Sequence, residues 1–382
     1  MKILKKIFIF SILSTFILSL IVILGGCFLF IAPPSKKSEE PQQPEIIVKG
    51  DLSVHFLELG NKYTGDSVYI KSGDADILID AGSKNGSAAT ITNYLSEYVE
   101  DGVLEYVIAT HAHEDHIAGF YSSGSGVNKI TGIFESYEVK TIIDFSMTDK
   151  TSPTPTSVYG RYLAARDAEI ALGAEHFTAL ECFNNENGAK RKYEIGDGAE
   201  LEILYNYYYD HTQSGGENDY SVCVMINYGD EHFLFTGDLE KKGEDKLVDY
   251  YEQNFGGLPH CVLYKAGHHG SSTSSNEKLL AAITPEYICA CTCAGSSEYT
   301  STIKNQFPTQ AFIDRIAVYT DKVYITTLVT DYSGNKFESM NGNIIFAIYN
   351  GQKQIICGNN DIKLKNTQWF SDYRDMPPAW SA

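Results

Sequence analysis

The stretch Thr110-His111-Ala112-His113-Glu114-Asp115-His116 holds three histidines and one aspartate within six positions. It directly follows the apolar run 104–109, Leu-Glu-Tyr-Val-Ile-Ala, which predicts a buried strand. Imidazole and carboxylate groups are ligands of zinc, and manganese or iron also accept them. Packing alone does not explain such a density of ligands at a strand end. The stretch therefore predicts a metal site.

The spacing within this stretch suits two ions. A His-x-His pair directs two imidazoles toward one ion, and Asp115 with His116 can serve a second ion beside it. The remaining ligands must come from other parts of the chain. Asp238 and the pair His268-His269 each follow a predicted strand, and strand ends of an α/β sheet meet at one edge. Asp238 alone would more often be a helix N-cap, but beside the histidine cluster it is predicted to complete the site.

Strand and helix patterns alternate along both halves of the chain. Turn residues at 65–66 and 73–74 separate short apolar strands and predict an antiparallel meander. The later segments predict an α/β fold in which two sheets pack face to face with helices outside, a four-layer αββα sandwich. The expected strands are 53–59, 67–71, 77–79, 104–109, 139–143, 201–205, 220–228, 232–235, 261–264, 287–293 and 323–327, and the expected helices are 88–99, 158–172, 239–251, 275–282 and 310–316.

The metal motifs resemble those of the metallo-β-lactamase-fold hydrolases. They are His111-x-His113-x-Asp115-His116, Thr236-Gly237-Asp238 and His268-His269-Gly270-Ser271. Further motifs resemble, more narrowly, the hydrolase domain of the ComEC competence proteins and their stand-alone relatives. These are Gly65-Asp66-Ser67, Leu78-Ile79-Asp80-Ala81-Gly82 and Asn218-x-x-Ser221. The resemblance covers about residues 53–350.

The resemblance implies a centre with two divalent ions, with zinc expected and manganese or iron as alternatives. The implied ligands are His111 and His113 for the first ion, Asp115 and His116 for the second, Asp238 as a bridge, and one of His268 or His269 for the second ion. Asp115 or Asp238 would accept a proton during hydrolysis, and the remaining histidine of the 268–269 pair would touch substrate. Five further residues are implied as positioning groups, namely Asp80 behind the ligand loop and Asn218, Ser221, Ser271 and Ser272 near substrate or loops.

The chain departs from the resembled pattern at several points. Residues 120–170 contain no histidine, so the third protein ligand of the first ion is open between Asp144, His211 and water. Ala118 replaces a glycine, and the loop 60–65 is longer than the subgroup's turn. A Gly-His-Pro motif is replaced by Gln306-Phe307-Pro308, which removes a polar residue from the expected site.

The first 50 residues predict a membrane tether. Three lysines precede the apolar run Ile7–Ala32, which exceeds the roughly 20 residues that cross a bilayer. Leu24-Gly25-Gly26-Cys27 resembles a lipoprotein box, and a single transmembrane span is the alternative. In both cases the domain is expected on the outer face of the cell membrane. The predicted parts are an anchor at 1–32, a flexible linker at 33–50, a hydrolase domain at 51–357 and a C-terminal tail at 358–382.

The rest of the chain is strongly acidic. Residues 1–50 hold six lysines and three glutamates, so residues 51–382 carry 24 basic and 46 acidic side chains. This balance argues against a strong polyanion-binding surface, because phosphate backbones are held by clustered lysine and arginine. Cys289, Cys291 and Cys293 alternate along a predicted strand, where small apolar core residues are favoured over a metal site.

Together these features predict an extracellular, membrane-tethered hydrolase with two metal ions. Phosphodiester bonds are the favoured target, in nucleic acid fragments or in envelope polymers that carry choline or glycerol. The tyrosine-rich run 205–209 is a possible contact for a choline-like cation, although a packed aromatic edge is favoured. A lactonase or other carboxyl-ester hydrolase is the alternative enzyme, and a surface protein that binds metal without turnover is the alternative outside enzymes. The oligomeric state is left open.

Overall fold

The structure of the protein is a computed structural model that describes residues 51–196, 198–211 and 215–381. In these ranges no helix is both long and apolar enough to cross a membrane. The predicted anchor and the whole predicted linker lie outside the described residues, and so does the lipoprotein-like Cys27.

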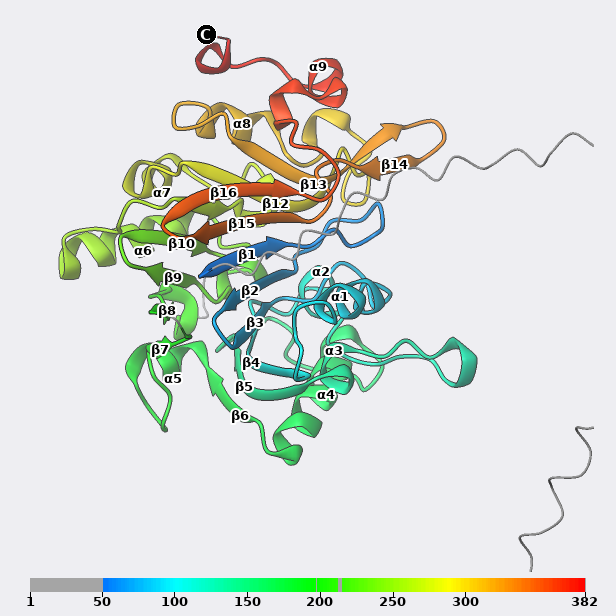
Figure 1. Ribbon diagram of the computed structural model, residues 1–382, viewed down its shortest axis with the longest axis vertical. Coiled ribbons are helices and arrows are strands. Elements are labelled where there is room, and N and C mark those ends of the chain that lie inside the picture. Colours follow the sequence, from blue (N-terminus) through cyan, green and yellow to red (C-terminus); the bar gives the residue numbers. More distant parts are fainter. Residues whose placement is uncertain (1–50, 197, 212–214, 382) are drawn as a thin grey trace, which may run out of the picture. The chain divides into compact units, whose positions relative to one another are not determined.

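Residues 51–381 contain two eight-stranded sheets (Figure 1). The strand order of the first sheet is β16-β15-β1-β2-β3-β4-β5-β6, with an antiparallel half from β16 to β3 and a parallel half from β3 to β6. The predicted meander is thus the run β1-β2-β3. The bounds are β1 (Leu52–Phe56), β2 (Val68–Ser72), β3 (Ala75–Ile79), β4 (Val103–Ala109), β5 (Glu138–Asp144), β6 (Glu175–Thr178), β15 (Ile344–Tyr349) and β16 (Gln352–Cys357).

The second sheet has the order β14-β13-β12-β11-β10-β9-β8-β7. Its central strands β10 to β13 are parallel, and antiparallel pairs form both edges. The bounds are β7 (Lys192–Glu194), β8 (Ala199–Ile203), β9 (Val224–Tyr228), β10 (Glu231–Phe235), β11 (Leu263–Lys265), β12 (Tyr287–Ala294), β13 (Val323–Asp331) and β14 (Lys336–Ser339).

The two sheets share one apolar core. Phe56 of β1 stacks on Phe235 of β10, and Phe233 of β10 meets Phe346 of β15 edge to face. Cys289 and Cys291 belong to this core, so these thiols act as small apolar side chains, as favoured from the sequence. Facing sheets of this kind bury the apolar face of each strand, which explains why so many strand residues are inaccessible.

Helices lie beside both sheets, with α1 to α4 next to the first and α6 to α8 next to the second (Figure 1). The predicted α/β class is therefore confirmed. The bounds are α1 (Ser87–Leu95), α2 (Glu114–Ile117), α3 (Ile133–Ser136), α4 (Val158–Leu172), α5 (Ala179–Asn184), α6 (Lys241–Phe255), α7 (Glu277–Ile283), α8 (Gln310–Ile316) and α9 (Gln368–Tyr373). The short 3-10 helices are η1 (Gly126–Asn128), η2 (Tyr207–Tyr209), η3 (Glu217–Tyr220), η4 (Gly267–Gly270), η5 (Ile303–Asn305), η6 (Leu364–Asn366) and η7 (Pro378–Trp380).

Several boundaries differ from the sequence-based expectation. The strand expected at 220–228 begins only at Val224, because Glu217–Tyr220 forms η3. The helix expected from Leu239 begins at Lys241, and its N-cap is Glu240. Asp238 therefore does not cap this helix. The elements β6, α5 and β7 were not expected, because their apolar positions are too few to give a clear period.

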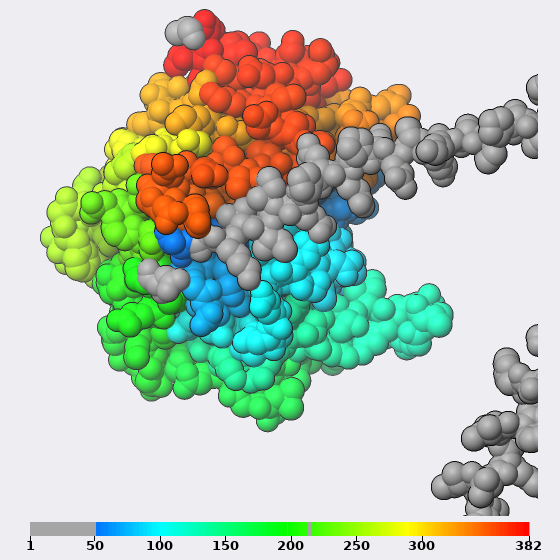
Figure 2. Space-filling view, in the orientation of Figure 1, coloured from blue at the N-terminus to red at the C-terminus, as the bar shows by residue number. Residues whose placement is uncertain are grey.

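Two segments extend from the sheets. A hairpin around the bridge between Ser123 and Ile130 projects from the neighbouring helices, as the space-filling view shows (Figure 2). The segment 358–381, which we delimited as a C-terminal tail, contains α9 and packs onto the second half of the domain. Trp369, Phe370 and Trp380 are buried in the core cluster there, and Trp380 Nε1 donates to the carbonyl of Thr320 at 2.9 Å.

Candidate metal centre

Strand ends from both sheets bring the predicted ligands together. In the first sheet, Asp80 follows β3 and the cluster His111–His116 follows β4, and these two strands are parallel neighbours. In the second sheet, Asp238 follows β10 and His268-His269 follow β11, again parallel neighbours. The backbone N–H of His268 donates to the carbonyl of Gly237 at 3.2 Å, which ties the two loops of the second sheet.

One oxygen of Asp238 lies among four imidazoles. Its Oδ2 lies 3.3 Å from Nε2 of His116, 3.4 Å from Nε2 of His269, 3.7 Å from Nε2 of His268 and 3.9 Å from Nε2 of His111. The nitrogens come from two sheets and from residues more than a hundred positions apart in sequence. An arrangement that points four nitrogen ligands at one carboxylate oxygen suits a bridging carboxylate between ions.

Asp80 fixes the orientation of His116. The Nδ1 of His116 donates to Oδ2 of Asp80 at 2.7 Å, which leaves Nε2 turned toward Asp238. Asp80 also accepts from the backbone N–H of Thr110 at 2.7 Å and from its hydroxyl at 2.8 Å. One carboxylate thus holds the start of the ligand loop and one of its imidazoles, as expected for Asp80.

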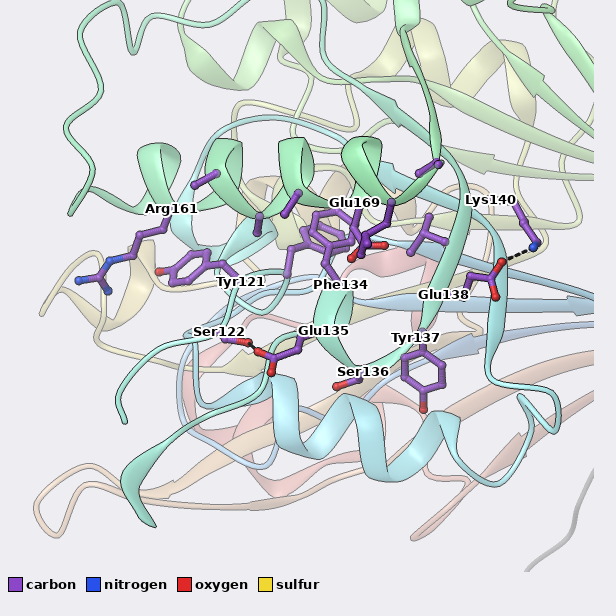
Figure 3. A pocket seen from close by; sticks show the side chains of 18 of the residues that line it. Tyr121, Ser122, Phe134, Glu135, Ser136, Tyr137, Glu138, Lys140, Arg161 and Glu169 are labelled. Carbon is purple, nitrogen blue, oxygen red and sulfur yellow. Dashed lines mark hydrogen bonds and ion pairs between the residues drawn. The ribbon is translucent and has the colours of Figure 1, made fainter. Parts of the chain in front are cut away.

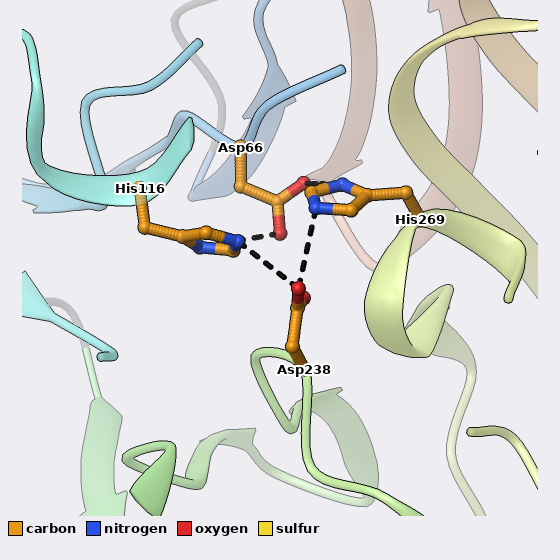
Figure 4. Close-up of side chains that lie close together, drawn as sticks. All are labelled: Asp66, His116, Asp238 and His269. Atoms are coloured by element: carbon orange, nitrogen blue, oxygen red, sulfur yellow. Dashed lines mark ion pairs between the residues drawn. The ribbon is translucent and has the colours of Figure 1, made fainter. Parts of the chain in front are cut away.

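His269 faces the carboxylate of Asp66, a residue to which the sequence analysis gave no role. The Nδ1 of His269 lies 3.1 Å from Oδ1 of Asp66, and its Nε2 lies 3.4 Å from Oδ2 of both Asp115 and Asp238. Figure 4 shows the imidazoles of His116 and His269 turned toward Asp238, with the carboxylate of Asp66 between the two rings on the opposite side. Ligand atoms of Asp66, His116, Asp238 and His269 all lie within 4.8 Å of one another.

His113 and Tyr299 complete the near surroundings. The Nδ1 of His113 lies 3.0 Å from Nε2 of His111, so the two imidazoles of the His-x-His pair meet. The hydroxyl of Tyr299 donates to Oδ2 of Asp115 at 2.6 Å. The ring of Phe307, which stands where the resembled motif has histidine, lies against His268 and His269. Tyr299 thus contacts Asp115, and Phe307 contacts His268 and His269.

Backbone conformation also marks this region. Asp80, His268 and His269 have φ angles of 60°, 46° and 54°, in the left-handed region that residues with a Cβ rarely adopt. Gly82 follows Asp80 closely, and a Cβ at Gly82 would lie 1.5 Å from the carbonyl oxygen of Asp115. Strained residues of this kind persist where the surrounding structure holds them, and they cluster at functional sites.

The centre has a negative potential. Burial would lower the pKa of His116, but the carboxylates of Asp238 and Asp80 outweigh it and hold the pKa well above its ordinary value. The pKa of His269 is also raised well above its ordinary value, because Asp66 and Asp238 outweigh burial. A potential that favours protons here also favours a divalent cation.

The residues present fit divalent ions. The Nε2 atoms of His116 and His269 are buried and make no hydrogen bond of good geometry with the described residues. Oδ1 of Asp238 is also buried and also lacks such a hydrogen bond. Buried polar atoms without hydrogen bonds are rare, and a metal is one of the partners that satisfies them. Imidazole and carboxylate donors around one point match zinc and also suit manganese or iron. The donor set therefore supports divalent metal binding without identifying the ion.

The two residues left open as a third ligand are engaged elsewhere. Asp144 accepts from the hydroxyl of Tyr162 at 3.1 Å and from Arg166 at 2.9 Å, and His176 lies 2.9 Å from its other oxygen. His211 is exposed and stacks on the ring of Tyr207. The possibility that either completes the first ion's site is therefore corrected, because their side chains are committed to other partners.

The predicted positioning residues lie in the loops around the ligands. Ser221 accepts from the backbone N–H of Asp238 at 3.0 Å, and its hydroxyl lies 3.4 Å from Nδ1 of His111. Asn218 donates to Glu240 at 3.3 Å. Ser271 bonds Thr273, whose hydroxyl lies 3.1 Å from Nδ1 of His268, while Ser272 is exposed. Ser221 is thus closest to the ligands, and the other three support loops.

Glu217 links the ligand loop to a neighbouring loop. Its buried carboxylate accepts from the backbone N–H of Ala112 at 2.8 Å through Oε1. Its Oε2 accepts from the hydroxyl of Thr148 at 2.7 Å and the backbone N–H of Asp149 at 2.9 Å. This loop borders a hollow of about 490 Å³ that reaches His113. Of the predicted ligands, only His113 is among the residues that line this hollow.

A larger hollow of about 1030 Å³ lies elsewhere, between α3 and α4 (Figure 3). Figure 3 shows Phe134, Tyr137, Arg161 and Glu169 around it. None of the predicted ligands lines it, so size alone does not locate the chemistry. The aromatic run 205–209 does not form an open cage either, since Tyr208 and Tyr209 are buried and Tyr205 stacks on Tyr250.

Comparison with known proteins agrees with this geometry. A family model of the metallo-beta-lactamase superfamily matches residues 60–122, which include Asp66, Asp80 and the whole His111–His116 cluster. The protein has the metallo-β-lactamase fold. The resemblance inferred from the motifs is confirmed at this level.

The chain is also similar to a curated competence protein. The chain is 28% identical over 294 residues to competence protein ComA of Neisseria gonorrhoeae, across 76% of this chain and 33% of that protein. The chain thus spans about a third of the length of this relative. Similar solved structures are YhfI from Bacillus subtilis (TM-score 0.39, 12% identity, 73% of this chain and 96% of that chain) and Igni18 from Ignicoccus hospitalis, described as a metallo hydrolase (TM-score 0.32, 13% identity, 62% and 81%).

Sequence reasoning missed Asp66, Lys265, Glu217 and Tyr299 at this metallo-β-lactamase-type centre. Only Lys265 left a usable signal, because a lysine at the end of the buried run Leu263–Lys265 needs an anionic partner nearby. Asp66 belongs to the motif Gly65-Asp66-Ser67, but the sequence of this motif does not show that Asp66 faces His269. Glu217 and Tyr299 come from loops whose positions depend on the packing of both sheets.

Proposed function

We propose that the protein is a hydrolase with two divalent metal ions that cleaves phosphodiester bonds at the outer face of the cell membrane. The arrangement around Asp238 carries the proposal, because its Oδ2 faces Nε2 of His111, His116, His268 and His269 at 3.3–3.9 Å. A single carboxylate oxygen in this position is available to two ions. Such a pair of ions is typical of enzymes that hydrolyse phosphoesters and related bonds.

The ligands divide into two groups. His111 and His113 lie together and are proposed for the first ion. Asp115, His116 and His269 are proposed for the second, because Nε2 of His269 lies 3.4 Å from Asp115. Asp238 is shared. Zinc is the proposed ion, with manganese or iron as alternatives. When bound, two such ions activate a water molecule for attack and neutralise the negative charge that builds up on the reacting group.

The side chains have distinct tasks in hydrolysis. Asp80 accepts a hydrogen bond from Nδ1 of His116, and Asp66 lies 3.1 Å from Nδ1 of His269, with the Nε2 atoms of both histidines facing the centre. Asp115 or Asp238 takes up the proton released by the attacking water. His268 has a 19% exposed side chain and is proposed to contact substrate. No side-chain nucleophile is required.

The proposed substrate is a small or polymeric phosphodiester other than long nucleic acid. The acidic balance of residues 51–382 disfavours long nucleic acids, since their phosphates are held by clusters of basic side chains. Similarity to a competence protein favours fragments of nucleic acid among the candidates, and phosphodiesters of the cell envelope are the alternative. The lysines before the apolar run Ile7–Ala32 support a membrane tether with the domain outside, either as a lipoprotein or as a single span.

The test compares bond types on one preparation. Purified full-length protein with measured metal content is given a bis-aryl phosphate and, separately, an aryl ester and a lactone. We expect cleavage of the phosphodiester to fall at least 100-fold in Asp238→Asn and to stay unchanged in Asp249→Asn, whose carboxylate pairs with Lys278 on the surface. Equal rates in the wild type and Asp238→Asn would overturn the proposal. Faster cleavage of the lactone or ester would replace the phosphodiesterase by a carboxyl-ester hydrolase.

A further inference from the structure

Lys265 places a positive charge inside the centre. It is the last residue of β11 and is 3% exposed, which is rare for lysine unless the ammonium is paired. Its Nζ forms an ion pair with Asp66, lies 3.8 Å from Oδ1 of Asp238 and donates to the carbonyl of Gly237 at 3.3 Å. Three oxygens from two sheets thus surround this ammonium.

The ammonium stays charged in the folded protein. The carboxylate of Asp66 pairs with it and the carboxylate of Asp238 lies 3.8 Å away, so two anions balance the positive charge in the buried centre. Four carboxylates are buried at the centre, those of Asp66, Asp80, Asp115 and Asp238. Lys265 is therefore a fixed cation among several fixed anions.

Asp66 lies close enough to bind metal itself. One of its oxygens is within 4.8 Å of the ligand atoms of His116, Asp238 and His269. Its Oδ1 is 3.1 Å from Nδ1 of His269, and its Oδ2 faces Lys265. Neither oxygen makes a hydrogen bond of good geometry with the described residues, so the ion pair with Lys265 is the contact that turns Oδ2 of Asp66 toward the ammonium.

We propose that Lys265 is a built-in counter-ion that keeps Asp66 out of the metal coordination. Without the ammonium, Asp66 becomes a further anionic ligand of the second ion. An additional carboxylate ligand tightens metal binding and weakens the ion as a Lewis acid. Lys265 is thus a positioning residue. It lowers the affinity for metal but keeps the bound ion a stronger Lewis acid for hydrolysis. The inference rests on the proposed metal centre but not on the bond that is cleaved.

The test replaces the ammonium and follows the metal directly. Full-length Lys265→Met is loaded with cobalt(II), and its visible absorption and its rate of cobalt loss to a chelator are compared with the wild type. We expect weaker visible bands, because the coordination number rises, and cobalt loss at least tenfold slower. Asp66→Asn in the Lys265→Met background should restore the spectrum and the rate. Lys278→Met, which removes an exposed lysine paired with Asp249, is the control without effect.

Folding of the variant is part of the test. Lys265→Met leaves Asp66 buried without its cation, which is strongly destabilising unless another cation replaces it. We expect the variant to be stabilised by cobalt more than the wild type is. A variant that stays unfolded at saturating cobalt would contradict the inference, as would an unchanged spectrum in a folded variant. A wild type that binds no cobalt would overturn the proposed metal centre itself, so the two failures are distinguishable.

Discussion

The carboxylate of Asp80 and the imidazole of His116 are joined at 2.7 Å although they are 36 positions apart in the sequence. Asp80 follows β3, and His116 closes the loop after β4, so the contact depends on the parallel pairing of these strands. The loop is further held by a hydrogen bond from the backbone N–H of Ala81 to the carbonyl of His116 at 2.7 Å. The position of one ligand is thus set by a neighbouring strand.

Replacing Asp80 tests this dependence. In Asp80→Asn the negative charge of the carboxylate that accepts from Nδ1 of His116 is lost. We therefore expect the affinity of the protein for the second metal ion to fall about 10- to 100-fold. The measurement is the metal dissociation constant obtained by competition with a chelator. The control is Asp144→Asn, which removes another buried carboxylate at a strand end, one that bonds Tyr162 and Arg166. If both variants bound metal as the wild type does, Asp80 would have no role in the centre.

Glu217 is predicted to connect metal binding with substrate binding. In Glu217→Gln the carboxylate that accepts from Ala112, Thr148 and Asp149 is replaced by an amide, and at least one of these donors loses its acceptor. We expect the unfolding free energy to fall by about 1–3 kcal/mol in urea denaturation. We also expect KM to rise more than kcat falls, because the loop beside the hollow at His113 loosens.

The surface substitution Glu138→Gln removes an exposed carboxylate that pairs with Lys140 and serves as the matched control. It should leave both KM and stability unchanged. A Glu217→Gln variant with lower stability but unchanged KM would mean that Glu217 only supports the fold.

His55 is predicted to make stability depend on pH. It is fully buried, with Nδ1 2.6 Å from the hydroxyl of Tyr94 and Nε2 2.7 Å from that of Ser53. Burial lowers its pKa from 6.5 to about 3. Between these values the unfolded chain takes up a proton that the folded protein does not, so this stability is present above about pH 6.5 and is lost as the pH falls.

The variant His55→Gln removes this proton uptake. Between about pH 7.5 and pH 5 we expect the wild type to lose about 2 kcal/mol more unfolding free energy than His55→Gln does. Urea denaturation at both values measures the difference. An equal loss in the two proteins would show that the imidazole is protonated in the folded state.

Much of the metal centre could be predicted because its ligands follow strands. His111–His116 is a dense local cluster, and Asp238 and His268-His269 stand at strand ends that the hydrophobic pattern reveals. Their mutual approach follows from the general rule that strand ends of α/β sheets meet at one edge. In contrast, the pairing of Asp66 with Lys265 joins the two sheets, and no local pattern shows which loops of facing sheets touch.

The fold was predicted best where local signals agree. The expected bounds of α4, Val158–Leu172, match the structure, because Ser157 caps its start and Gly173 ends it in a left-handed conformation. The bounds of α8, where Thr309 is the N-cap, match as well. The region between residues 175 and 200 could not be predicted, because β6, α5 and β7 are only a few residues long, and β6 is stabilised by pairing with β5 more than 30 positions earlier.

The metal content of the purified full-length protein tests the central claim most directly. It is measured by elemental mass spectrometry after weakly bound metal has been removed, beside that of Asp238→Asn. Because Oδ2 of Asp238 faces all four imidazoles, we predict two divalent ions per chain in the wild type and at most one in the folded variant. A wild type without tightly bound ions, or a variant that retains both, would contradict the account.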